Sequence, residues 1–188
     1  NKSGNVSCRV DGGFAITPAW VPYRELQPGH IVTLALEGAL DGASAPATAV
    51  RPSSEWRMHA AVYRARTDVA AVVHTHSPRA TALASAGRGI PPFHYMIALA
   101  GGDIRCTSYA TFGSSELAQS AVQGLQGRRA CLLGNHGVMA VGSSLARAHA
   151  VAIEVENLAS AYLALLAAGL EPRLLDDAEI RNVVARFT

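Results

Sequence analysis

Two histidines at the end of an apolar run are the sharpest chemical feature of this sequence. Residues 72–76 read VVHTH, so one residue separates His74 from His76 at the end of an expected strand. On an extended backbone this spacing places both side chains on one face. Two adjacent imidazoles repel each other when protonated and suit a shared cation when neutral. The two rings form either a pair of metal ligands or a chance pair at a strand end.

A third histidine, His136, stands between glycines in the segment 134–137, which reads GNHG. Glycines let the backbone turn sharply and let a bulky ligand approach closely. Taken alone, His136 fits a loop histidine held by its neighbours at least as well as it fits a ligand. With His74 and His76 it completes a set of three nitrogen donors that leaves a fourth tetrahedral position open. Such a set is typical of catalytic rather than structural zinc.

Glu55 follows Ser53 and Ser54 at the expected start of a helix. An acid in the first helical turn interacts favourably with the helix dipole, and that alone would explain its presence. Beside a metal, the same carboxylate can act as a general base. The remaining histidines receive no catalytic role: we expect structural or surface positions for His59 and His149, a loop-orienting position for His94, and no evident partner for His30.

The elements that must position these side chains alternate between strand and helix. Apolar and β-branched runs predict strands at 6–10, 14–17, 31–36, 69–73, 104–109, 130–133 and 138–141. Helical spacing and capping residues predict helices at 55–66, from 78 onward, at 114–125, at 144–168 and after 176. Residues 18–30 and 38–52 read as loops. The pattern predicts one layered α/β domain over residues 1–188, and its early hairpins imply a mixed sheet.

Composition excludes several classes of protein. The chain has 188 residues, and Lys plus Arg exceeds Asp plus Glu by only two, 16 against 14. That balance gives no reason to expect nucleic acid or a membrane surface as a partner. No apolar run approaches the roughly 20 residues that span a bilayer, and the first residues show no signal-peptide pattern. Three widely separated cysteines argue against a disulfide framework, so we expect a reduced, cytoplasmic protein.

Several motifs together resemble the class II aldolase/adducin family, and most of all its members that cleave a ketose 1-phosphate such as fuculose 1-phosphate. They are residues 52–59 (PSSEWRMH), 72–76 (VVHTH), 94–102 (HYMIALAGG), 109–113 (YATFG) and 135–139 (NHGVM). The resemblance implies a three-layer α/β/α domain around a mixed, largely antiparallel sheet. It also implies a homotetramer with active sites at the subunit interfaces. The implied reaction is zinc-dependent cleavage to dihydroxyacetone phosphate and an aldehyde through a metal-stabilised enediolate.

The resemblance also assigns roles to residues of this chain. It implies one Zn²⁺ per subunit, and it makes Glu55 the acid/base, which can occupy the open metal position when no substrate is bound. Tyr95 matches a tyrosine that reaches a neighbouring subunit's site and donates a proton on the aldehyde side, where Phe112 matches an apolar wall. The implied metal ligands are His74, His76 and His136, and the implied phosphate-binding residues are Gly4, Asn5, Ser53 and Ser54.

The sequence departs from the family pattern in two respects. The family usually has Thr or Ser and then Gly after Ile-Thr-Pro, but here residues 16–18 are followed by Ala19 and Trp20. A hydroxyl of the phosphate pocket is therefore replaced by a methyl group, and a ring stands where no side chain was. We also expect the family's N-terminal helix, and a C-terminal tail with a second catalytic tyrosine, to lie outside the printed sequence.

The family includes four alternative functions, three of them enzymatic. A decarboxylase of a 3-oxo sugar-acid phosphate needs the same enediolate stabilisation, and a dehydratase fits as well. A sugar-phosphate 4-epimerase fits less well, because those relatives usually carry Asp at the position of Glu55. A non-catalytic module like the adducin heads has no need of the full set of three histidines and Glu55. Metal analysis separates such a module from an enzyme.

Overall fold

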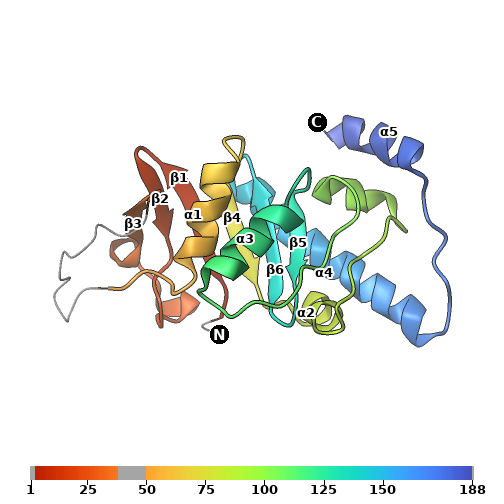
Figure 1. Cartoon of the computed structure of the whole chain (residues 1–188), viewed down its shortest axis with the longest axis horizontal. Helices are drawn as coiled ribbons and strands as arrows, with labels where there is room; N and C mark the ends of the chain where they lie inside the picture. The colour runs from red at the N-terminus through yellow and green to blue at the C-terminus, as the bar shows by residue number, and fades with distance from the viewer. Residues whose placement is uncertain (1–2, 38–49, 188) are drawn as a thin grey trace.

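The structure is a computed structural model that describes residues 3–37 and 50–187. Figure 1 shows the course of the chain. Its strands are β1 (Asn5–Val10), β2 (Gly13–Ile16), β3 (Val32–Ala35), β4 (Ala71–Thr75), β5 (Ala130–Leu133) and β6 (Gly137–Gly142). Its α-helices are α1 (Trp56–Ala65), α2 (Pro78–Ser85), α3 (Ser115–Gly124), α4 (Leu145–Ala167) and α5 (Asp177–Phe187). Short 3₁₀ helices are η1 (Tyr23–Glu25), η2 (Pro28–His30) and η3 (Tyr95–Ala100).

Within the described ranges, six strands form one sheet in the order β3-β2-β1-β4-β6-β5. Every pair of neighbouring strands in this sheet is antiparallel. The parallel component of the expected mixed sheet is an isolated bridge between Cys106 and Leu132. Strand β4 lies between β1 and β6, so the strand that ends in the two histidines is paired on both edges.

Helices cover both faces of the sheet, which confirms the three-layer α/β/α architecture (Figure 1). On one face, α1 and α3 pack over residues such as Phe14, Val72 and Val141. On the other, α2 and α4 pack over Ala71 and Val73, and η3 and α5 extend that layer. Alternate residues of β4 therefore enter opposite cores, as the twofold period of a strand requires.

Three local predictions need correction. Residues 104–109 form no strand, because Ile104 bonds to Ile90 while Leu132 bonds to the two residues flanking Cys106, and no continuous ladder develops. The expected loop at 18–30 contains η1 and η2, and His30 has a partner there: its Nδ1 accepts a hydrogen bond from the Gln27 amide at 3.3 Å. Most of the expected loop at 38–52 lies outside the described residues.

The start of α1 also differs in detail from the expectation of a serine cap. Glu55 itself is the N-cap residue, and its side chain makes no capping hydrogen bond. Ser53 instead accepts a hydrogen bond from the Glu55 amide through its Oγ, at 3.4 Å. The carboxylate of Glu55 is consequently free of the helix and can serve the site described below.

Helix α4 is the one described helix that is long and apolar enough, by length and composition alone, to cross a membrane. Its inner face packs in the core against the sheet and α2, through residues that include Ala148, Val155 and Leu158. Its outer face carries His149 and Asn157. The outer face also carries the half-exposed Ile153, so polar residues do not cover that face completely.

Candidate metal centre and active site

Four side chains from three segments converge at the end of β4. They are Glu55, His74, His76 and His136, whose ligand atoms all lie within 4.8 Å of one another. The Nε2 atoms of His74 and His76 are 3.0 Å apart. The carboxylate oxygens of Glu55 lie 3.3 Å from His74 Nε2 and 3.0 Å from His136 Nε2. The structure thus brings together the three predicted ligands and the predicted acid/base.

A backbone hydrogen bond on the side of the ring away from the cluster fixes the orientation of His74. Its Nδ1 lies 2.8 Å from the carbonyl oxygen of Val138, so this nitrogen carries the proton and donates it. When the ring is neutral, its Nε2 carries no proton, and this nitrogen faces the cluster. A hydrogen bond of this kind, from the outer nitrogen of a histidine, is what orients a histidine that binds a metal.

The charges in the cluster favour a neutral His76 beside an ionised Glu55 carboxylate. Burial lowers the pKa of His76 to about 4, and the neighbouring His74 and His136 lower it as well. Burial alone would raise the pKa of Glu55, but the imidazoles of His136 and His74 hold it well below its usual range. Glu55 Oε1 is buried and lies 3.0 Å from His136 Nε2, but the two atoms are not aligned for a hydrogen bond, so this oxygen accepts none among the described residues. Three nitrogen donors and one carboxylate with lone pairs facing inward fit a divalent metal, and zinc accepts this donor set.

The turn that carries His136 depends on its neighbours. Asn135 adopts a left-handed conformation with φ 53°, and its backbone amide donates to the carbonyl of Ala84 at 3.1 Å. Gly137 begins β6 so close to β4 that a Cβ atom would lie 2.4 Å from the Thr75 carbonyl oxygen. Only glycine permits this approach, which places His136 next to the end of β4.

A cavity of about 360 Å³ opens beside the four-residue cluster. Phe112 and the four predicted phosphate-binding residues line this cavity, so the structure brings these positions together. The four are Gly4, Asn5, Ser53 and Ser54. Two further cavity residues, Tyr109 and Asn135, received no individual role from the sequence. Tyr109 and Asn135 stand in the YATFG and NHGVM motifs, which is the signal that could have found them. The full lining comprises Ser3, Gly4, Asn5, Pro18, Ala19, Trp20, Ser53, Ser54, Glu55, His76, Tyr109, Ala110, Phe112, Asn135 and His136.

Asn5 joins the acid/base to the predicted phosphate end of the cavity. Its side-chain amide donates to Glu55 Oε2 and to Ser53 Oγ, both at 2.9 Å. Gly4 precedes it with φ +80°, and a Cβ atom there would lie 2.6 Å from the His74 carbonyl oxygen. The close pairing of β1 with β4 therefore explains the glycine whatever its part in binding an anion.

Trp20 stands at the mouth of the cavity, and its side chain is 81% exposed. Its backbone has φ 67°, a left-handed conformation that is unusual for a bulky residue. The segment is anchored because Ala19 donates to the Arg51 carbonyl at 2.9 Å and Pro18 pairs with Pro52. The ring points outward, so it does not fill the cavity.

Tyr95 is the predicted site residue that this single chain does not bring to the cavity. It lies in η3 and is 53% exposed, in a hollow shared with α5 residues that include Val183 and Phe187. The neighbouring His94 caps η3, because its Nδ1 accepts a hydrogen bond from the Met96 amide. That contact matches the loop-orienting position expected for His94.

Comparison with known proteins identifies the family. The profile of the class II aldolase and adducin N-terminal domain matches residues 1–163. A 5-methylthioribulose-1-phosphate/5-deoxyribulose-1-phosphate aldolase of Rhodospirillum rubrum is 45% identical over 98% of this chain and 81% of its own length. An L-fuculose phosphate aldolase of Escherichia coli K12 is 44% identical over 98% of this chain and 84% of its own length.

The fold agrees with a solved structure of an L-fuculose 1-phosphate aldolase. That structure superposes with a TM-score of 0.91 at 38% sequence identity, over 99% of this chain and 86% of the other. Class II aldolases depend on a metal, and the cluster of Glu55 with three histidines is a set that can bind one. The chain belongs to the class II aldolase and adducin family, and within it to the aldolases, which are carbon–carbon lyases.

Proposed function

We propose that this chain is a zinc-dependent aldolase that cleaves a ketose 1-phosphate to dihydroxyacetone phosphate and an aldehyde. The observation that carries the proposal is the convergence of three imidazoles and Glu55 beside a cavity lined by hydroxyl and amide donors. The names of the relatives from R. rubrum and E. coli, which are aldolases for ribulose and fuculose phosphates, support a ketose phosphate as substrate. The sugar itself is left open.

The metal would be held by His74, His76 and His136, and when bound it supplies a Lewis acid that stabilises negative charge on substrate oxygens. The chain's own residues handle the protons. As the carbon–carbon bond breaks, the electron pair stays on the dihydroxyacetone phosphate half. Glu55 is ionised at rest, so it first takes up a proton, equivalent to the one that the substrate hydroxyl releases, and then delivers it to that carbon. The hydroxyl on the other half loses its proton as it becomes the aldehyde, and Tyr95 of a neighbouring subunit is placed in this step.

The phosphate would occupy the end of the cavity formed by Gly4, Asn5, Ser53 and Ser54. No lysine or arginine is among the described residues that line the cavity, so neutral donors and the N-terminal end of α1 would bind the anion. Ala19 offers no hydroxyl, which should weaken phosphate binding by about 1 kcal/mol without abolishing it. Competition by inorganic phosphate or phosphoglycolohydroxamate tests this end of the site.

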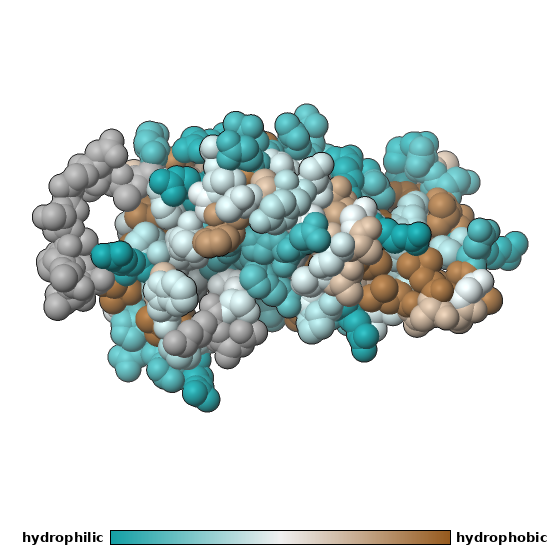
Figure 2. Space-filling view, turned by 60° about the horizontal axis from the view of Figure 1, so that its bottom comes forward, coloured by the Kyte–Doolittle hydropathy of each residue, from teal (hydrophilic) through white to brown (hydrophobic). Residues whose placement is uncertain are grey.

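We further propose a homotetramer in which Tyr95 completes a neighbour's site. Tyr95 is exposed and lies outside its own subunit's cavity, as such a role requires. Figure 2 shows apolar side chains gathered at the end of the molecule that carries α4 and its connection to α5, where Leu170 and Leu174 are exposed. An exposed apolar surface of this kind is suited to subunit contact.

Subunit mixing tests the shared site. Glu55→Gln and Tyr95→Phe chains should each be nearly inactive as pure assemblies. Dissociated and reassembled together, they should regain activity, because some interfaces then combine a wild-type Glu55 with a wild-type Tyr95. Failure of the mixture to regain activity, or a fully active monomer by light scattering, would exclude the shared site.

The proposal as a whole is tested by a cleavage screen over ketose 1-phosphates, with and without zinc, in which aldehyde and carbon dioxide release are both followed. Aldehyde release that requires zinc supports the aldolase. Carbon dioxide release from 3-oxo sugar-acid phosphates, without aldehyde, would overturn it in favour of a decarboxylase. A protein that purifies without stoichiometric metal and cleaves nothing would be a binding module.

A reduced, cytoplasmic location belongs to the proposal, and the free thiols of Cys8, Cys106 and Cys131, all in the described ranges, agree with it.

A further inference from the structure

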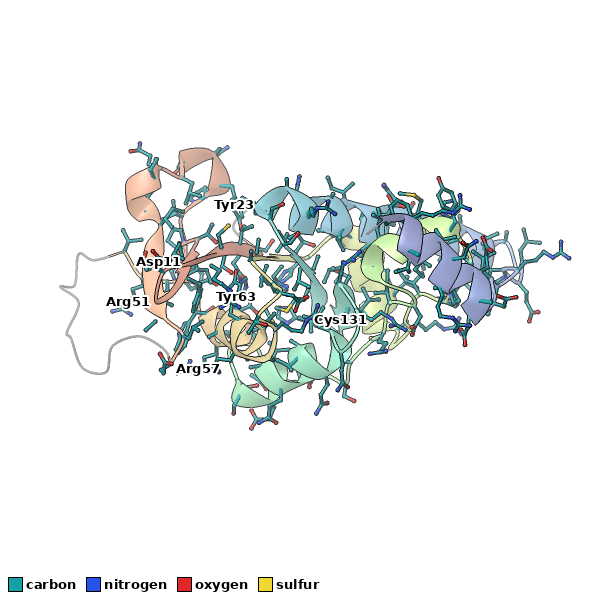
Figure 3. The ribbon with its side chains drawn as sticks, turned by 90° about the horizontal axis from the view of Figure 1, so that it is seen from above. Asp11, Tyr23, Arg51, Arg57, Tyr63 and Cys131 are labelled. Carbon is teal, nitrogen blue, oxygen red and sulfur yellow. The ribbon has the colours of Figure 1, made fainter. Side chains whose placement is uncertain are left out.

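A row of buried polar side chains runs from Glu55 into the core between α1 and β1. Tyr63, labelled in Figure 3, lies at its inner end between this helix and the sheet. Every member of the row is nearly inaccessible to solvent: Asn5, Ser7, Glu55, His59 and Tyr63. Polar groups at such depth cost stability unless they are hydrogen-bonded, and each residue of this row makes at least one hydrogen bond to another member.

The row exists because the spacing of the helix matches that of the strand. Glu55, His59 and Tyr63 are four residues apart and share one side of α1, with a rise of about 6 Å per step. Asn5 and Ser7 are two residues apart on one face of β1, with a rise of about 6.6 Å. The two series therefore stay in step, and each strand residue bonds to the helix residues on either side of it.

One assignment of donors satisfies every hydrogen bond in the row, and it starts from the ionised Glu55 carboxylate, which only accepts. Asn5 uses both amide hydrogens, one toward Glu55 Oε2 and one toward Ser53 Oγ. Its Oδ1 must then accept, so His59 Nε2, at 2.5 Å, carries the proton that it donates. In a neutral ring His59 Nδ1 is the acceptor, and it receives the Ser7 hydroxyl hydrogen at 2.7 Å. Ser7 Oγ in turn accepts from the Tyr63 hydroxyl at 2.8 Å.

We propose that His59 is a positioning residue for the reaction: through its Nε2–H it fixes the orientation of the Asn5 amide, and Asn5 thereby holds Glu55 and Ser53 in their working positions. This inference rests on the proposed acid/base role of Glu55. If the Asn5 amide were flipped, its oxygen would face the Glu55 carboxylate, which accepts hydrogen bonds but donates none when ionised. A donor at His59 Nε2 excludes that arrangement.

The charge state of His59 agrees with this role. The pKa of His59 is lowered to about 3. Burial is the largest cause and the nearby His74 adds to it, while Glu55 opposes the change. A neutral ring has one donor and one acceptor, which is what the row requires. A protonated ring would donate from both nitrogens and leave the Ser7 hydroxyl hydrogen without an acceptor.

Two substitutions separate the proposed role from simple filling of space. In His59→Gln the side-chain amide reaches the level of Nε2 and can still donate to Asn5. In His59→Asn the amide stops at the level of Nδ1, near Ser7, and leaves Asn5 Oδ1 without its donor. In the full-length, zinc-loaded enzyme we expect His59→Gln to stay within a few-fold of wild type. We expect His59→Asn to lose roughly 10–100-fold in kcat with zinc content unchanged. Its KM should also rise, because Asn5 no longer holds Ser53 in position to bind the phosphate. Equal kcat and KM in His59→Asn and wild type would overturn the inference.

A second measurement does not depend on activity or on the fate of a variant. Nitrogen-15 NMR of the histidine rings in the zinc-loaded wild-type protein reports which ring nitrogen is protonated. The inference requires a neutral His59 with its proton on Nε2, and a proton on Nδ1 would overturn it. If wild type cleaves no ketose 1-phosphate, the proposed function fails, while this spectrum still decides the hydrogen-bond direction.

Discussion

Asn5 lies directly opposite His74 in the antiparallel pairing of β1 with β4. Directly paired residues project to the same face of a sheet, so the strand that supplies a metal ligand is joined at that point to the strand that orients Glu55. The acid/base and the nitrogen donors are therefore fixed by one sheet rather than by separate loops. The predictions below follow from this shared frame.

Zinc should bind one per subunit and should be lost when a ligand is removed. His76→Ala removes a ligand at the exposed rim of the cluster, so the fold should survive while metal content and turnover fall. His149→Ala, which removes an exposed histidine of α4, is the matched control and should change neither. Metal analysis of the purified variants, with chelator treatment and zinc re-addition for wild type, provides the measurement. Stoichiometric zinc in His76→Ala would contradict the assignment.

Glu55→Gln should retain zinc and lose roughly 10²–10⁴-fold in turnover, because the amide preserves shape but cannot carry the proton. Glu171→Gln changes an exposed acid in the connection between α4 and α5 and serves as the control. Steady-state cleavage rates at equal zinc occupancy give the comparison. Unchanged turnover in Glu55→Gln would exclude the acid/base role and leave Glu55 only a structural role at the start of α1.

Gly137→Ala should destabilise the protein by about 2 kcal/mol or more, because the new methyl group would collide with the backbone of β4. Gly29→Ala is the control, since nothing lies within 4 Å of a Cβ atom there and its φ is not positive. Urea unfolding of the metal-free proteins measures both. Equal midpoints for the two variants would show that β6 can shift away from β4.

The backbone of Trp20 should favour glycine. At φ 67° a residue with a Cβ atom is strained by about 1 kcal/mol, whereas glycine is not. Trp20→Gly should therefore be more stable than Trp20→Ala by a margin of that size, and both lack the ring. Comparing Trp20→Ala with wild type then isolates what the ring does to KM. A Trp20→Ala variant as stable as Trp20→Gly would mean that the segment relaxes to a negative φ.

The metal-free protein should lose stability as the pH falls from about 6.5. The pKa of His59 is about 3 in the folded chain, below its unfolded value, so the unfolded chain takes up the proton first. The free energy of unfolding should then decrease by up to about 1.4 kcal/mol per pH unit for this histidine. His59→Gln should reduce the slope between about pH 6 and pH 5, above the pKa values of unfolded carboxylates. An identical slope in the variant would contradict the burial of a neutral ring.

The sequence predicted most of the fold because its signals are local. Apolar runs, Gly-rich turns and capping residues placed the six described strands and the α-helices within a few residues of their observed bounds. The region 104–109 was predicted wrongly because its apolar, β-branched run is local, whereas its hydrogen bonds divide between distant partners, Ile90 and Leu132. Strand formation depends on such partners, which a single run of residues does not reveal.

The sequence by itself determined that His74 and His76 share a face and that His136 follows a sharp turn, because strand periodicity and glycine geometry are properties of short segments. The residues alone left Glu55 as either a helix cap or a base beside a metal, and they gave His59 only a structural or surface position. Only the tertiary structure decided that Glu55 reaches these histidines and that His59 reaches Asn5. Those contacts depend on the register of β1 against β4 and on the packing of α1 over both strands. Register and packing are set by long-range burial of side chains such as Phe14 and Val72, which no local pattern encodes.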